Sequence, residues 1–196
     1  MTTVRSNPMI QGPPATLDDL YRVEGKAELI DGRIVQFMAS GHDPSTVALD
    51  IAISLRKYVK AAGRGYAYSD GIGFAIQPTR LSRRQSFSPD ASYYDGPLPQ
   101  NRMRFIEGAP TFAVEVRSED DYGPAAERAM AAKRADYFEA GTQVVWDVDP
   151  VARTIACYRS SAPIQVTLFK AGDVADAEPA VPGRRLAVDE LFSTKD

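Results

Sequence analysis

The sequence is poor in the residues that build zinc centres and disulfides. Among its 196 residues there is one cysteine, Cys157, and one histidine, His42. A Cys/His zinc site needs several such ligands and a disulfide needs two cysteines, so neither can form within the chain. A single free thiol is compatible with a reducing compartment, and we therefore expect a cytoplasmic protein.

Long apolar runs and an excess of positive charge are also missing. No stretch approaches the roughly 20 apolar residues of a transmembrane helix, and the N-terminus lacks the apolar segment of a signal peptide. The formal net charge of −3 argues against general coating of nucleic acid. We expect no membrane contact, a flexible lead over residues 1–15 and a single domain over residues 16–192.

Hydrophobic periodicity and turn residues predict a mixture of helices and strands. An N-cap signal at Thr16 indicates a short helix, and Asp31-Gly32 between two apolar runs indicates a hairpin. The central elements expected next are a helix over 44–62 capped by Asp43, strands over 65–77, 87–94 and 111–117, a helix over 124–140 and a strand over 143–149.

This order predicts an α/β (α+β) domain with a mixed central sheet flanked by helices. The strand over 65–77 contains Gly71 and Gly73, so a bend or bulge is expected there. A further hairpin is expected within residues 153–169. The tail from residue 171 has a loop-like composition and ends in a segment, 186–192, that can dock back on the domain.

A glutamate stands inside the most core-like of the predicted strands. In the run from Phe112 to Arg117, bulky apolar residues alternate with smaller or charged ones, and Glu115 lies between two valines. Burying a glutamate without a partner is costly, so Glu115 either pairs with a cation or binds a metal. Asp90 follows Pro89 on the preceding strand. If the two strands pair, these carboxylates form an oxygen site suited to Mg²⁺ or Mn²⁺.

A lysine is expected to face this site from the following helix. Lys133 shares one face of the helix over 124–140 with Met130 and Tyr137. Its ammonium could stabilise charge on a phosphate or orient an attacking water. The alternative is a purely structural lysine paired with Glu115.

Arginines gather around Asp90 in the sequence. Residues 78–104 hold five arginines against two aspartates, which is compatible with a phosphate-facing rim or with an ordinary solvated loop. Arg83 and Arg84 are the candidates for nucleic-acid contacts here. Glu28 in the first hairpin either adds a third acid to the site or is a solvated strand residue, and His42 either has a function or belongs to a capping loop.

These motifs resemble a known nuclease superfamily. Pro89-Asp90, Glu115-Val-Arg117 and the αβββαβ order are similar to the PD-(D/E)XK nucleases. Over residues 16–192 the chain resembles, more specifically, the Uma-type restriction endonuclease family. The fragments that carry this resemblance are Ala27–Arg33, Ser88–Asp90, Val114–Ser118, Lys133–Gly141, Val145–Pro150 and Pro182–Leu186.

The resemblance implies hydrolysis of DNA phosphodiester bonds with Mg²⁺ or Mn²⁺. It also implies that Asp90, Glu115 and the backbone carbonyl of Val116 bind the metal. The superfamily places a lysine two residues after the glutamate, where this chain has Arg117. Arginine can hold a phosphate, but its pKa is too high for a general base, so Lys133 is the expected substitute.

Two functions from different classes follow. The first is a Mg²⁺-dependent endonuclease that acts on DNA, as a monomer or a homodimer. The second is a catalytically degenerate module that keeps the nuclease fold and binds nucleic acid or a protein partner. The first is the leading hypothesis, and the arginine at position 117 and the acidic net charge keep the second open.

Overall fold

A computed structural model of the chain describes residues 13–192. Most of the flexible lead predicted for residues 1–15 lies outside this range. None of the helices within it is long and apolar enough to cross a lipid bilayer.

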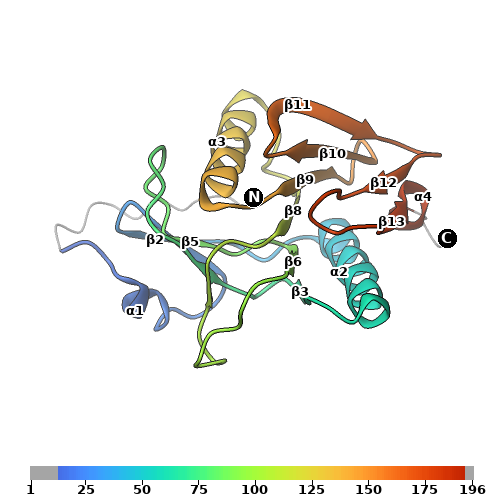
Figure 1. Cartoon of the computed structure of the whole chain (residues 1–196). Helices are drawn as coiled ribbons and strands as arrows, with labels where there is room; N and C mark the ends of the chain where they lie inside the picture. The colour runs from blue at the N-terminus through green and yellow to red at the C-terminus, as the bar shows by residue number, and fades with distance from the viewer. Residues whose placement is uncertain (1–12, 193–196) are drawn as a thin grey trace.

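A six-stranded mixed sheet forms the centre of the fold (Figure 1). Its strand order is β11-β10-β9-β8-β6-β3, and every neighbouring pair is antiparallel except β8 and β9. The parallel pair requires a crossover, which helix α3 (Pro124–Ala140) supplies. The strands are β3 (Tyr66–Ser69), β6 (Ala91–Tyr94), β8 (Phe112–Val116), β9 (Val144–Asp149), β10 (Thr154–Arg159) and β11 (Ala162–Phe169).

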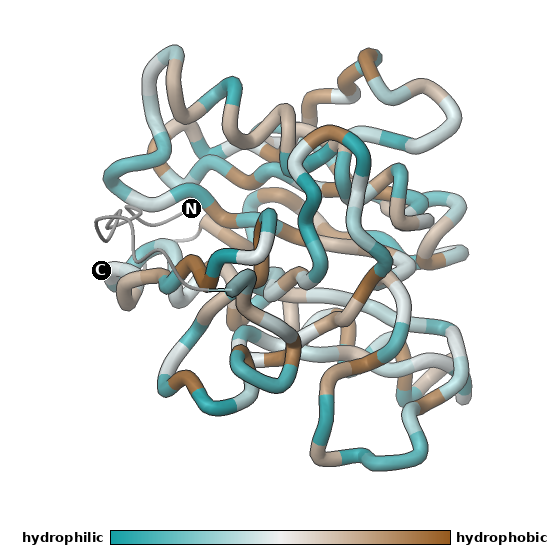
Figure 2. Tube along the Cα trace, turned by 90° about the vertical axis from the view of Figure 1, so that its left-hand side faces the viewer, coloured by the Kyte–Doolittle hydropathy of each residue, from teal (hydrophilic) through white to brown (hydrophobic). Residues whose placement is uncertain are grey.

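Helices α2 (His42–Ala62) and α3 cover opposite faces of this sheet (Figure 1). Successive side chains of a strand point to opposite faces, and β8 follows this rule. Val114 packs in the same cluster as Ile51 of α2, whereas Ala113 packs with Tyr137 of α3. Hydrophobic segments accordingly gather in the middle of the molecule, and most outer loops are hydrophilic (Figure 2).

Three smaller sheets and two short helices complete the described chain. The hairpin β1–β2 docks on the central part through the backbone: the Gln85 amide donates to the Leu29 carbonyl at 2.8 Å, and the Leu29 amide donates to Ser86 Oγ at 2.8 Å. The remaining elements are α1 (Leu17–Leu20), β1 (Ala27–Ile30), β2 (Arg33–Gln36), β4 (Phe74–Ala75), β5 (Ser86–Phe87), β7 (Ile106–Glu107), β12 (Val174–Asp176), β13 (Arg185–Ala187) and α4 (Val188–Leu191).

The predicted mixed α and β architecture is confirmed. The order α2-β3-β6-β8-α3-β9 is the αβββαβ order expected from the sequence. Thr16 caps α1 through a reciprocal bond with Asp19, and both turn residues of the first hairpin, Asp31 and Gly32, have the expected positive φ. Helix α3 starts after Gly123 and ends at Gly141, as predicted.

Four features of the fold differ from the prediction. The strand over 65–77 is two strands, β3 and β4, in different sheets, because the chain turns at Gly71 with φ 96°. The strand over 87–94 is broken between β5 and β6. Helix α2 begins at His42 with Gly41 as its cap, so Asp43 lies in the first turn. The tail contains a hairpin, β12–β13, which a loop-like composition did not reveal; its last segment docks on α2 as expected.

Candidate active site between the central sheet and helix α3

Asp90 and Glu115 lie beside each other on neighbouring strands. Ala91 of β6 pairs with Val114 of β8, so the next position of the antiparallel register sets Asp90 opposite Glu115 on one face. Two hydrogen bonds hold Asp90 there. Its amide donates to the Val114 carbonyl at 3.0 Å, and its Oδ2 accepts from the Val116 amide at 2.7 Å. The predicted convergence of these two strands therefore occurs.

Lys26 provides the first ammonium group at these carboxylates. Its Nζ lies 2.6 Å from Asp90 Oδ1 and 2.8 Å from Asp70 Oδ1. Burial by itself would lower the lysine pKa, but the charges of Asp90 and Glu115 outweigh it and raise that pKa. The Lys26 side chain keeps 20% of its surface exposed, so this cation borders solvent.

Lys133 provides the second ammonium and is almost fully buried, with 4% exposure. Its Nζ lies 2.8 Å from Glu115 and 3.1 Å from Glu28 Oε1. The Tyr137 hydroxyl also donates to Glu115, at 2.7 Å. Burial raises the pKa of Glu115 and the neighbouring Asp90 adds to this, whereas Lys133 acts in the opposite direction. Lys133 thus faces the site as expected, and it makes the pair with Glu115 that the structural alternative describes, together with a second pair to Glu28. Its catalytic role stays a prediction.

Glu28 is completely buried and belongs to the same network. Its Oε1 accepts from the Ser88 amide at 3.0 Å, and its Oε2 is paired with Arg84. Burial alone would raise the Glu28 pKa, but Lys133 and Arg84 together lower it, so the carboxylate is ionised at neutral pH. A solvated strand glutamate, one of the two expectations, is therefore wrong for Glu28.

Eight charged side chains gather here and are named the carboxylate–cation cluster. Their ion pairs form two sets, one around Lys26 and one that runs from Glu115 through Lys133, Glu28 and Arg84 to Asp136, and the two sets adjoin where Asp90 influences Glu115. The members are Glu28, Asp70, Asp90, Glu115, Asp136, Lys26, Arg84 and Lys133. Five carboxylates face three cations, which leaves an excess of two formal negative charges in the cluster.

This excess suits a divalent cation. Within residues 13–192 no three Asp, Glu, His or Cys side chains gather closely enough to hold a metal by themselves. Mg²⁺ does not need such a cage, because it keeps several waters and commonly binds one or two carboxylates together with substrate phosphates. Asp90 and Glu115 fit that requirement. The main-chain amide of Val116 contacts Asp90; metal binding by its carbonyl stays a prediction.

Arg117 is paired with carboxylates that are not members of the cluster. Its guanidinium forms a bidentate pair with the buried Asp147, at 2.8 and 2.9 Å, and a second pair with Glu127 at 2.5 Å. The hydrogen bonds that Arg117 donates to Asp147 and Glu127 raise the arginine pKa above its usual range. Its donors are thus paired with two carboxylates, and contact of Arg117 with a phosphate stays a prediction.

The two rim arginines lie in different environments. Arg84, expected on an exposed rim, is 4% exposed, and its Nε lies 3.2 Å from Asp136 Oδ2. Its guanidinium is thus enclosed by carboxylates and is not available to a phosphate in solution, which corrects the expectation. Arg83 is exposed and pairs with Asp31 at 3.0 Å, so it stays a candidate contact. His42 is exposed at the start of α2, on the other face of the sheet.

Three members of the cluster were missed from the sequence, although two left a signal. Lys26 and Glu28 are two positions apart, so in an extended chain both side chains point to the same side. Asp136 follows Lys133 by three positions and therefore shares its face of α3. Asp70 left no comparable signal, because it lies in the turn that follows β3.

Two comparisons with known proteins show the family and the fold of the chain. The family model described as "Uma2: Putative restriction endonuclease" matches residues 14–189. A crystal structure described as a putative nuclease belonging to DUF820, from Anabaena variabilis, superposes with a TM-score of 0.71 at 21% sequence identity, over 91% of this chain and 98% of the other. At that identity the likeness establishes the fold. No curated protein matches the chain. Because the family model spans most of its length, the chain belongs to the Uma2 family of putative restriction endonucleases.

Proposed function

We propose that this protein is a Mg²⁺- or Mn²⁺-dependent endonuclease that hydrolyses phosphodiester bonds in DNA. The observation that carries the proposal is the position of Asp90 opposite Glu115, which follows from the register of β6 and β8. Two ammonium groups contact these carboxylates, and the cluster around them has an excess of negative charge. Membership of a restriction endonuclease family supports the same chemistry.

In this proposal Asp90 and Glu115 hold the metal. When bound, the metal would polarise the phosphate and lower the pKa of a coordinated water. The hydrogen bond from the Val116 amide orients Asp90, and the Tyr137 hydroxyl orients Glu115. Both carboxylates are thus held in place by groups that do not need to move.

The two lysines receive different roles because their donors are used differently. An ammonium has three donors. Those of Lys133 are taken up by the carboxylates of Glu115 and Glu28, and the residue is buried. Lys26 contacts Asp70 and Asp90 and borders solvent. Lys26 is therefore the better cation for a substrate phosphate, whereas Lys133 positions Glu115.

A plasmid-nicking assay with Mg²⁺ or Mn²⁺ tests the proposal. We expect the wild type to cut, and Asp90→Asn and Glu115→Gln to lose at least about 100-fold in rate, the usual cost of removing one electrostatic group from such a site. Lys60→Met is the control, because Lys60 is exposed on α2, on the face of the sheet opposite the cluster. Equal rates in the wild type and Asp90→Asn would refute the assignment.

One observation favours the degenerate module as a second candidate. Ammonium groups already contact both proposed metal-binding carboxylates, and a cluster that is satisfied in this way can be purely structural. Calorimetric titration with Mn²⁺ separates the candidates. Heat of binding that disappears in Asp90→Asn supports the nuclease, and no heat in the wild type supports the module.

Cleavage of both strands of a DNA duplex requires two active sites or two successive cuts. A single site of this kind cuts one strand at a time, so we propose a homodimer in the cytoplasm as the form that breaks duplex DNA. Sedimentation with and without a DNA duplex is the test. A species that remains monomeric while it linearises plasmid in one step would contradict the dimer.

A further inference from the structure

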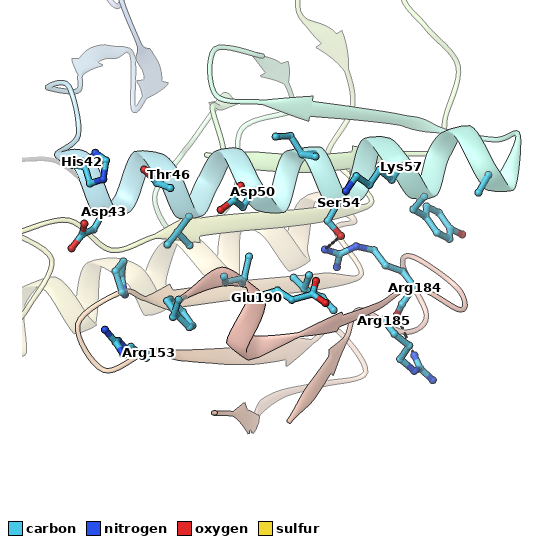
Figure 3. A pocket seen from close by; sticks show the side chains of 18 of the residues that line it. His42, Asp43, Thr46, Asp50, Ser54, Lys57, Arg153, Arg184, Arg185 and Glu190 are labelled. Atoms are coloured by element: carbon cyan, nitrogen blue, oxygen red, sulfur yellow. Dashed lines mark hydrogen bonds between the residues drawn. The ribbon is translucent and has the colours of Figure 1, made fainter. Parts of the chain in front are cut away.

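A groove runs along helix α2 on the face of the sheet opposite the carboxylate–cation cluster. Its volume is about 940 Å³, and its other wall is formed by the segment 183–186, α4 and the turn that follows β9 (Figure 3). The acidic residues of this lining are Asp43 and Asp50 from the first half of α2 and Glu190 from α4. The other end is lined by Ser54, Lys57 and Arg184.

Arg184 is the unusual residue of this groove. It is 3% exposed, and its guanidinium donates one hydrogen bond, from Nη2 to Ser54 Oγ at 3.1 Å. Its Nε and Nη1 are buried without a hydrogen-bond partner. Within residues 13–192 no carboxylate lies at ion-pair distance from it. Burial without a compensating charge lowers the Arg184 pKa to about 10.

The surrounding structure fixes Arg184 in this position. The Tyr58 hydroxyl donates to the Pro182 carbonyl at 3.0 Å, which fastens the segment to α2. Gly183, with φ 77°, allows the tight turn just before the arginine. The guanidinium carbon lies 5.1 Å from the centre of the Trp146 ring. The guanidinium is therefore fixed at the groove wall rather than free to swing into solvent, and a ligand must displace a covering side chain to reach its buried donors.

A charge buried in this way is strongly destabilising unless something compensates it. We propose that the Arg184 end of the groove binds a phosphate group, held by the guanidinium and by Ser54 and Lys57. Guanidinium groups match phosphate oxygens in a bidentate manner, and a hydroxyl and an ammonium supply the further donors that a phosphate accepts. Lys57 is exposed on the groove wall and can close over the bound group.

The proposal does not depend on nuclease activity, because α2 and α3 lie on opposite faces of the sheet. Two sources could supply the same chemistry, a free phosphorylated small molecule or the backbone of a nucleic acid. Three probes distinguish them: inorganic phosphate, a 5′-deoxynucleoside monophosphate and a short DNA duplex, each in EDTA and at ionic strength matched with NaCl.

Thermal unfolding of the full chain measures binding, since a ligand that binds the folded state raises Tm by mass action. We expect a saturable rise for the wild type. Arg184→Met should weaken the apparent affinity by at least about tenfold, the loss expected for a charged hydrogen bond. Lys57→Met should weaken it less. Lys60→Met is the matched control, because Lys60 lies one turn further along α2 and outside the groove lining.

Each outcome decides the matter. A rise with inorganic phosphate and the mononucleotide assigns a small-molecule site, and a rise with the duplex alone that Arg184→Met removes assigns a nucleic-acid contact. No saturable rise with any probe, or the same rise in wild type and Arg184→Met, would overturn the site. If Arg184→Met fails to fold, Ser54→Ala and Lys57→Met carry the comparison, and an unchanged affinity in both would overturn it equally.

Discussion

Two buried guanidinium groups, Arg84 and Arg184, differ in whether carboxylates of the chain compensate their charge. Both are less than 5% exposed. Arg84 is paired with Glu28 and Asp136, and these carboxylates raise its pKa although burial opposes them. Arg184 has a serine hydroxyl, and burial lowers its pKa to about 10. The guanidinium on the α3 side is thus compensated by carboxylates of the chain, whereas the guanidinium in the groove beside α2 has no carboxylate partner within the described residues.

The largest effect is expected where the internal compensation is broken. Lys133→Met should destabilise the fold by about 3–5 kcal/mol, because it leaves Glu28 and Glu115 short of a buried cation. Urea unfolding at pH 7 measures this. Arg80→Met, an exposed cation outside the cluster, should change the free energy of unfolding by less than about 0.5 kcal/mol. A Lys133→Met variant as stable as this control would show that the cluster does not depend on its cation.

Arg184→Met should change the free energy of unfolding in the opposite direction. In phosphate-free buffer it should stabilise the fold by about 1–3 kcal/mol, since an apolar side chain of similar length replaces a buried charge that has no carboxylate partner. The same urea titration applies. A loss of stability comparable to that of Lys133→Met would mean that the two faces do not differ in compensation.

A smaller effect is expected in the pH dependence of stability. The folded-state pKa of Glu28 is lowered from 4.5 by Lys133 and Arg84, against burial. Glu28 therefore contributes stability that is present above pH 4.5 and is lost as the pH falls through its folded pKa. Between pH 6 and pH 3 the free energy of unfolding should fall less for the Glu28→Gln variant than for the wild type, as measured by urea unfolding. Parallel pH profiles would contradict this assignment.

The smallest effect is expected at the surface. Arg83 is exposed and paired with the exposed Asp31, so Arg83→Ala should change stability by less than about 0.5 kcal/mol. If Arg83 contacts a phosphate, the variant should reduce the salt dependence of DNA binding by about one unit of slope. Fluorescence anisotropy at several salt concentrations measures that slope, and an unchanged slope would remove Arg83 from the interface.

Much of the fold could be predicted because periodicity and turn chemistry act locally. The hairpin at Asp31-Gly32 and the limits of α3 at Gly123 and Gly141 follow from residues that need positive φ or stop a helix. The division of residues 65–77 between two sheets could not be foreseen. Gly71 permits a bend or a full turn, and tertiary packing decides between them.

Contacts in the site could be predicted where both residues lie on regular strands or helices. They could not be predicted where loops bring the residues together. Glu115 and Lys133 lie on regular elements, and their expected meeting is observed. Arg84 gave no indication of burial, because an arginine in a polar loop has the same local pattern whether its side chain points outward or inward. Its position follows from the docking of the β1–β2 hairpin, which is a long-range event.

The composition of the carboxylate–cation cluster has a consequence for folding kinetics. Arg84 and Glu28 are 56 positions apart in the chain, and Lys26 and Asp90 are 64 apart. Closing loops of this length costs more chain entropy than closing short ones, and proteins rich in contacts of high sequence separation fold more slowly. The site also requires α3 to pack on the sheet, because Lys133 comes from α3 and Glu115 from β8. A chain in which the first hairpin or α3 is undocked therefore does not contain the candidate site.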